Sequence, residues 1–253
     1  MMNDFFFRYL YIIKQVGGRY YLIAGITFFL FYVLWRTRIQ HKKIQLKFPA
    51  HRDYYREIFF SSFTILLFAL IPTLIVFNPA VRPYTQLYST IAERGWGYYF
   101  LLYPVLFFIH DTYFYWIHRF MHHPRLFKWF HLVHHRSTNP SPWAAYAFHP
   151  LEAFLEVGIF ALFLFIFPIH RTHLIIFFLL SIIYNVYGHL GWELYPKGFH
   201  QSRIGRWINT STSHNQHHKY FTGNYGLYFL FWDRWMGTLR AEYDEAFEEV
   251  TSR

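Results

Sequence analysis

The sequence of 253 residues contains no cysteine. This absence excludes disulfide scaffolds, thiolate haem, iron–sulfur clusters, cysteine-ligated zinc sites and thiol nucleophiles. Charged residues are also scarce, since they make up 15% of the chain and soluble domains average about 25%. Long charge runs and heptad repeats are absent from the sequence, which excludes a disordered chain and a coiled coil. What is present is apolar: 54% of the residues are hydrophobic and 25% are aromatic.

Acidic residues are the rarer charged class. The chain has 14 acidic side chains and 24 lysines and arginines, which gives a net charge of +10. The basic residues are spread between long apolar runs, as in a membrane protein whose cytoplasmic loops collect positive charge. We therefore expect a membrane as the partner of this surface and no nucleic acid.

Five apolar runs predict membrane helices, and they cover residues 20–35, 58–77, 95–109, 154–169 and 174–187. The second run alone has the length needed to cross a hydrocarbon core, and the shorter ones resemble core helices of soluble proteins. Five such runs in one chain favour membrane helices over the core helices of a soluble protein. The last two are separated by so short a turn that they must form an antiparallel hairpin. The expected fold is all-α, a multi-pass transmembrane helical bundle with about four to five membrane segments.

Loop charges predict how this bundle is oriented. The loop 36–57 contains seven basic and two acidic residues, whereas 78–94 contains two basic residues and one acidic residue. By the positive-inside rule the first loop is cytoplasmic and the second lies outside. Counting segments then places the stretches 110–150 and 188–240 on the cytoplasmic side, as a histidine-rich helical cap.

Histidine is the residue in marked excess. Fifteen of the 17 histidines fall between residues 110 and 218. Eight of them form one HxxxH and two HxxHH blocks, which comprise His118, His122, His131, His134, His135, His214, His217 and His218. Residues three and four apart share one helix face, so each block can present several imidazoles to one metal ion.

Eight imidazoles are too many for one ion, and two metal ions are the economical prediction. Imidazole ligands suit iron, zinc, copper and nickel alike, so the residues alone leave the metal open. The blocks contain no Glu-x-x-His pair, which excludes the class of soluble di-iron bundles.

Other polar residues are weaker candidates. His189 ends the fifth apolar run and is expected to be a ninth ligand, with Asn185 one turn earlier as a supporting group or water anchor. His110 is a less favoured ligand, and Asp111 could orient a ligand imidazole. His149 is expected to be either a polar group of the substrate pocket or a helix cap. Six histidines without a chelating partner are expected at the interface or in solvent, namely His41, His51, His123, His170, His173 and His200.

At these motifs the sequence resembles the sterol desaturase / fatty acid hydroxylase superfamily. The matching segments are DTYFYWIHR at 111–119, the block 131–135, SPWAAYAFHPLE at 141–152, GH at 188–189, the block 214–218, GNYG at 223–226 and WDRWMGT at 232–238. They lie in order over roughly the second half of the chain.

The resemblance implies a non-haem dimetal centre, usually two iron ions, although zinc could occupy it after purification. It implies nine ligands and no catalytic residue beyond them: His118, His122, His131, His134, His135, His189, His214, His217 and His218. One branch of the superfamily has a further histidine where this chain has Asn185. The expected division is 1–94 as transmembrane segments with a basic cytoplasmic loop, and 95–253 as a fatty acid hydroxylase-like catalytic domain.

The expected function is O2-dependent hydroxylation or desaturation of a C–H bond in a sterol, fatty acyl chain or related lipid. The sequence has no flavin or nicotinamide fingerprint and no cysteine, so the electrons must come from an external donor protein. Basic residues expected on the cytoplasmic face would attract an acidic carrier or lipid head groups alike. They are Arg119, Arg125, Lys128, Arg136, Lys197, Arg203, Arg206 and Lys219.

Two other functions stay open at this point. A membrane metal-binding or transport protein would also contain histidine clusters, although transporters usually place ionisable groups at mid-membrane depth. A zinc-dependent lipid hydrolase would need a base beside an open metal position, and the sequence contains no HExxH motif.

Overall fold

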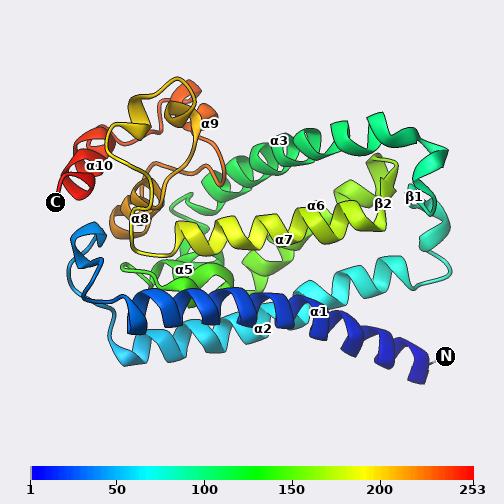
Figure 1. Cartoon of the computed structure of the whole chain (residues 1–253). Coiled ribbons are helices and arrows are strands. Elements are labelled where there is room, and N and C mark those ends of the chain that lie inside the picture. Colours follow the sequence, from blue (N-terminus) through cyan, green and yellow to red (C-terminus); the bar gives the residue numbers. More distant parts are fainter. Residues whose placement is uncertain (1) are drawn as a thin grey trace.

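The computed structural model describes residues 2–253 and confirms the predicted all-α bundle. Its long helices lie side by side in Figure 1. They are α1 (Met2–Phe28), which continues as a π-helix over Phe29–Leu34, α2 (His51–Val76), α3 (Gly95–Met121), α6 (Pro150–Ile166) and α7 (Arg171–Gly188). Each of the five apolar runs therefore forms a helix, and the predicted hairpin is the pair α6 and α7.

Within the described residues, four helical segments are long and apolar enough to cross a membrane: Asp4–Leu34, His51–Val76, Gly95–Met121 and Arg171–Gly188. The fifth helix, α6, is shorter at 17 residues. The expectation of about four to five membrane segments is thus confirmed. Several helices extend beyond the apolar runs, because backbone hydrogen bonding continues through polar residues. Helix α3 in particular carries His118 on its last turn, and His122, the second histidine of the first block, directly follows it.

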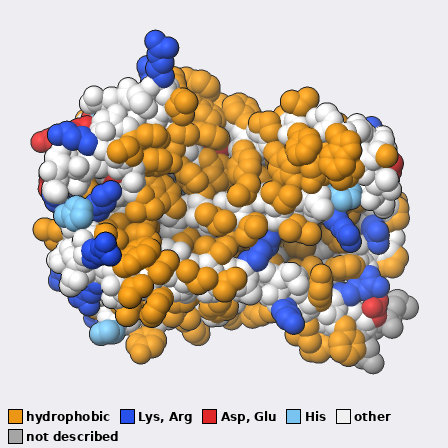
Figure 2. Space-filling model, viewed as in Figure 1, with side chains coloured by type: hydrophobic (Ala, Val, Ile, Leu, Met, Phe, Trp, Pro, Cys, Tyr) orange, Lys and Arg blue, Asp and Glu red, His pale blue; other side chains and the backbone are white. Residues whose placement is uncertain are grey.

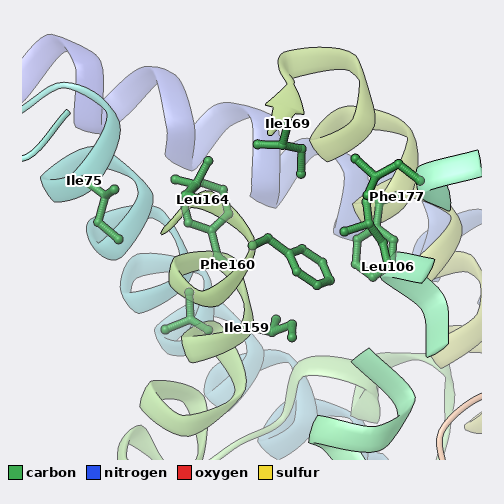
Figure 3. Packing of buried hydrophobic residues seen from close by; sticks show 10 residues of the cluster. Ile75, Leu106, Ile159, Phe160, Leu164, Ile169 and Phe177 are labelled. Atoms are coloured by element: carbon green, nitrogen blue, oxygen red, sulfur yellow. The ribbon is translucent and has the colours of Figure 1, made fainter. Parts of the chain in front are cut away.

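The outer surface of the bundle is apolar, as a lipid-facing surface should be. Large hydrophobic side chains are exposed along the long helices, for example Phe59, Phe100 and Leu101, which are 62–70% exposed. Hydrophobic side chains cover much of the face shown in Figure 2. The interior is apolar too: in Figure 3 Leu106, Phe160 and Phe177 belong to one buried cluster contributed by α3, α6 and α7.

One end of the bundle is closed by a small parallel sheet. Strand β1 (Leu87–Tyr88) pairs with β2 (Ile169–His170) beside the α6–α7 turn. His170 accepts from the backbone N–H of Thr172, and His173 accepts from the backbone N–H of His170. Both histidines are buried. Of the two positions expected for them, solvent was wrong, because their ring nitrogens cap the start of α7.

The opposite end carries the cap, built of short helices (Figure 1). These are α4 (Phe127–Phe130), α5 (Leu132–His135), α8 (Ser211–Tyr220), α9 (Phe231–Trp235) and α10 (Tyr243–Thr251). Further 3₁₀ turns span Gln40–Lys42, Arg82–Tyr84, Ile91–Glu93, Pro142–Tyr146, Phe199–Gln201 and Gly205–Trp207. His200 is another correction: it is 1% exposed and packs against the ring of Phe247, 4.5 Å away, and not in solvent.

Two contacts fix the cap to the bundle. The hydroxyls of Tyr20 on α1 and Ser61 on α2 donate to the backbone oxygen of Trp143, at 2.7 and 2.9 Å.

At the start of α8, the side chain of Thr210 accepts from the N–H of Ser213, and the carboxylate of Glu193 accepts from the N–H of Thr212. An anion at a helix N-terminus is stabilising, so the third histidine block begins on a well-anchored helix.

Candidate metal centre

Nine histidines meet at the cap end of the bundle in two groups. The five-histidine cluster consists of His118, His122, His131, His135 and His217, and the four-histidine cluster of His134, His189, His214 and His218. Within each group the candidate ligand atoms lie within 4.8 Å of one another. The structure therefore brings together all nine histidines that the sequence singled out as ligands, and distributes them over two positions.

Each cluster draws on distant parts of the chain. His118 is on the last turn of α3, and His122 directly follows that helix. His131 directly precedes α5, whereas His134 and His135 are on it. His189 follows the last residue of α7, and the third block is on α8. His134 and His135 are adjacent, and they point to different clusters. The HxxHH pattern is what allows one short helix to serve both.

In the five-histidine cluster the rings face each other through Nε2. The Nε2 atoms of His118 and His131 are 2.9 Å apart, and those of His135 and His217 are also 2.9 Å apart. On the outer side, Nδ1–H of His118 donates to the backbone oxygen of Tyr225 at 2.8 Å, and that of His217 to the oxygen of Gly223 at 2.7 Å. Nδ1 of His131 lies 2.6 Å from the carboxylate of Glu152.

The four-histidine cluster is centred on His189. Its Nε2 lies 3.0 Å from Nε2 of His214, 3.1 Å from that of His218 and 3.3 Å from that of His134. Its Nδ1–H donates to the backbone oxygen of Asn185 at 2.7 Å. Asn185 therefore supports His189 as expected, but through its main chain, because its side chain donates to the backbone oxygen of Ala145.

This donor set fits bound cations. A backbone oxygen can only accept, so the contacts of His118, His189 and His217 place the proton of each ring on Nδ1. The Nε2 lone pairs of these rings then point inward at other imidazole nitrogens about 3 Å away. Such lone pairs repel one another unless a proton or a metal ion lies between them. Carbonyl and carboxylate partners on the outer nitrogen are also the usual support of histidine ligands.

Burial argues against protons as the shared cations. Removal from water lowers the pKa of His134, His135, His214, His217 and His218 well below its ordinary value, and the neighbouring imidazoles lower it further. The rings are accordingly neutral at pH 7, which is the form that binds metal ions.

Aromatic rings surround the two clusters. Phe114 lies 5.0 Å from His118, Phe148 5.1 Å from His134, and Phe221 5.1 Å from His135, measured between ring centres. These side chains keep bulk water away from the imidazoles. In such surroundings electrostatic interactions are stronger than in water.

Two weaker candidates lie outside the clusters. His110, the less favoured ligand, belongs to neither cluster, and its Nδ1 lies 2.9 Å from the hydroxyl of Tyr228. Asp111 orients no imidazole, because its carboxylate accepts from the backbone N–H groups of Tyr228 and Phe229 at 2.7 and 3.2 Å.

The remaining histidines lie outside both clusters. His149 precedes α6 and accepts from the N–H of Leu151, so it is a helix cap. His41, His51 and His123 are exposed, as expected.

Glu152 is the functional residue that sequence reasoning missed. It is 1% exposed on the first turn of α6 and contacts His131. The available signal was an acidic residue two positions after the His-Pro pair at 149–150, in an otherwise apolar segment. The sequence also gave no signal for the backbone oxygens of Gly223 and Tyr225, which accept from cluster histidines. Their loop is held by buried Asp233, whose carboxylate accepts from the N–H groups of Tyr225 and Gly226, both at 2.8 Å.

Comparison with known proteins places these features in context. The family model described as fatty acid hydroxylase matches residues 103–238, which include all nine histidines. A Delta(7)-sterol 5(6)-desaturase of Gibberella zeae is 33% identical over 85% of this chain and 64% of its own length. A protein of the same description from Leptosphaeria maculans is 32% identical over 94% of this chain and 64% of its own length.

A third relative is a lathosterol oxidase of Rattus norvegicus, 35% identical over 73% of this chain and 60% of its own length. The chain thus spans less than two thirds of these relatives. No solved structure matches it.

Proposed function

Because the chain belongs to the sterol desaturase / fatty acid hydroxylase superfamily, we propose that it is a membrane-embedded enzyme that uses O2 to hydroxylate or desaturate a lipid. The proposed cofactor is a pair of iron ions, one in each histidine cluster. All nine histidines are proposed as ligands, and residues 95–253 as the catalytic domain that contains them.

The observation that carries this proposal is the convergence of nine buried imidazoles whose Nε2 atoms face one another at about 3 Å. Two redox-active ions held there would supply O2 activation, which zinc ions cannot supply. The residues around the ligands would position the imidazole rings. Glu152 and the carbonyl groups of Gly223, Tyr225 and Asn185 hold the ligand rings in one tautomer and orientation.

The position of the clusters supports an enzyme over a metal transporter. Both clusters are built from the cap helices and the cap ends of α3 and α7, and Figure 1 shows α5 and α8 at that end of the bundle. Transporters place such groups at mid-membrane depth. We propose that this end faces the cytoplasm, as the loop charges predict, and that an external protein delivers the electrons there.

The names of the relatives suggest the first substrates to try. Two are Delta(7)-sterol 5(6)-desaturases and one is a lathosterol oxidase, so we propose a sterol as the first substrate class to test. The test uses the full chain in detergent, loaded with iron, with a chemical reductant, O2 and either a Δ7-sterol or a fatty acyl lipid.

Mass spectrometry of the lipids then separates the outcomes. Loss of two hydrogen atoms from the sterol supports desaturation, and gain of one oxygen atom supports hydroxylation. A protein that binds zinc tightly and consumes no O2 with any lipid would instead indicate a hydrolase and contradict the proposal.

A further inference from the structure

A groove between α3 and α7 lies toward the end of the bundle that the small sheet closes (Figure 1). It has a volume of about 510 Å³, which is in the usual range for small-molecule sites. Both helices are long and apolar enough to cross a membrane, so a molecule that occupies the groove would be a lipid. The walls are mainly aromatic, and they include Trp96, Tyr99, Phe100, Tyr103, Phe107 and Leu180.

A chain of hydrogen bonds runs from His170 to the wall of this groove. Nε2 of His170 lies 3.0 Å from the backbone oxygen of Ser89. A carbonyl oxygen can only accept, so the ring proton is on Nε2 and Nδ1 is an acceptor. The backbone N–H of Thr172 donates to this Nδ1 at 3.3 Å, and the hydroxyl of Thr172 lies 2.8 Å from it. The Thr172 hydroxyl is therefore a donor to His170.

The direction of the remaining bonds follows, because each hydroxyl has one proton. The proton of Thr172 is used on His170, so the hydroxyl of Tyr99, 2.8 Å away, donates to Thr172. The hydroxyl of Tyr103 in turn donates to that of Tyr99 at 3.1 Å. The Tyr103 oxygen is the last member of the chain, and within residues 2–253 no donor is bonded to it. A hydroxyl that donates in such a chain also becomes a better acceptor.

We propose that this groove binds a lipid alcohol with a flat, rigid apolar body, which is the chemistry of a sterol. Its hydroxyl donates to the Tyr103 oxygen, and its rings lie against the aromatic walls. Trp96 and Phe107 are 11 residues apart on α3, which is about 16 Å along the helix. Trp96 is 62% exposed, and tryptophan favours the membrane–water interface. The hydroxyl end of the lipid is therefore the end nearer to the membrane surface.

This site is separate from the metal centre. Tyr103 and His118 are 15 residues apart on α3, which is about 22 Å along the helix. A lipid held by Tyr103 is accordingly not the molecule that is oxidised, and it fills the seam between α3 and α7 instead. Its binding requires neither a metal ion nor O2, so the inference goes beyond the proposed function and does not depend on it.

The first test compares two ligands that differ in one donor proton. The full chain in detergent micelles is saturated with tritium-labelled cholesterol, without any reductant, and unlabelled competitors are added. Cholesteryl methyl ether has the same rings as cholesterol but no O–H. It should compete about fivefold less well than unlabelled cholesterol, because it lacks one neutral hydrogen bond. Equal competition by the two compounds would overturn the role of the Tyr103 oxygen.

Two phenylalanine variants locate the effect. Tyr103→Phe removes the acceptor and keeps the ring, so the preference for cholesterol over its methyl ether should disappear. Tyr98→Phe is the matched control on the same helix. Tyr98 is outside the groove lining, and its hydroxyl donates to the backbone oxygen of Pro168 at 2.7 Å. This control should keep the preference, and its loss in both variants or in neither would overturn the site.

A third variant and a third ligand test the groove itself. Leu180→Trp places a larger side chain in the lining and should displace cholesterol and its methyl ether alike. Unchanged binding in Leu180→Trp would place the sterol elsewhere on the chain and overturn the site. The ligand 1-octadecanol has the hydroxyl but no rings, and it should compete more weakly than cholesterol. Equal competition by octadecanol would overturn the assignment to a flat-bodied lipid. A chain that binds cholesterol in this way but no iron would contradict the proposed function alone.

Discussion

Nδ1 of His131 and Oε1 of Glu152 lie 2.6 Å apart, and both side chains are almost completely buried. The contact joins the second histidine block to the first turn of α6. A carboxylate on the outer nitrogen fixes the ring orientation and makes Nε2 a better donor to a metal ion. A neutral imidazole donates to this buried carboxylate but does not balance its charge, whereas a metal ion on Nε2 of His131 would. The pair is therefore best explained as part of a metal site.

Replacing Glu152 by Gln should lower metal affinity. The amide keeps the shape of the side chain but removes the negative charge, and such changes behind a ligand typically cost about 10–100-fold in affinity. Iron binding measured by competition with a chelator provides the check. Glu156→Gln is the matched control, one turn along α6, and should bind iron as the wild type does. Equal affinity in all three proteins would refute the role of Glu152.

Two adjacent histidines offer a sharper comparison. His122 belongs to the five-histidine cluster, whereas His123 is exposed and belongs to neither cluster. His122→Ala should reduce the iron content from about two ions per chain to about one, because a site that loses a ligand binds its ion less tightly. His123→Ala should leave it unchanged. Iron counted after desalting is the measurement, and a larger loss for His123→Ala would reverse our assignment.

Much of this site was predictable, because its ligands follow local rules. Three- and four-residue spacings place imidazoles on one helix face whatever the rest of the chain does, and apolar runs form helices wherever the membrane or core receives them. His118 and His217 could be named from spacing alone. Their distribution over two clusters could not, since it depends on how α3, α5 and α8 pack.

The errors share one cause. His173 and His200 have no chelating partner in the sequence and were expected in solvent or at the interface, yet both are buried by segments far away in the chain. Asp111 lies on α3 at a spacing that could reach a ligand, but it accepts from the loop at 228–229. Glu152 is the converse case: no spacing singled it out, yet it contacts the predicted ligand His131. Tertiary packing decides which partner a lone polar residue meets, and single-sequence spacing carries no information about it.

Lys43 should make stability depend on pH. Its ammonium is fully buried and has no hydrogen-bond partner; the ring centres of Trp192 and Phe48 lie 4.7 and 4.8 Å from Nζ. Burial, and then the nearby charge of Arg36, lower the pKa of Lys43 from 10.5 to about 8. Between these two values the unfolded chain binds more protons than the folded one, so stability should rise with pH across this window.

The variant Lys43→Met isolates this effect. It removes a desolvated charge whose pKa shift corresponds to about 3 kcal/mol at pH 7. We therefore expect the variant to be more stable than the wild type at pH 7. The difference should shrink as the pH rises from about 8 to 10.5, because deprotonation then removes the same charge from the folded wild type. Thermal unfolding of both proteins at several pH values provides the measurement, and a pH-independent difference would disprove the buried charge.

Gly223 should be essential to the metal site for steric reasons. Its φ is +76°, and a Cβ there would lie 2.7 Å from the backbone oxygen of Thr238 and 2.9 Å from Cγ of Arg240. Gly237 has a similar φ of +64° but no atom within 4 Å of a Cβ. Left-handed backbone costs alanine about 1–2 kcal/mol, so Gly237→Ala should lose that amount and no more. Gly223→Ala must also move the carbonyl that accepts from His217. It should therefore lose about 3 kcal/mol and about tenfold in iron affinity, measured by thermal unfolding and chelator competition. If both variants lose stability equally and bind iron equally well, the Gly223 carbonyl does not support the cluster.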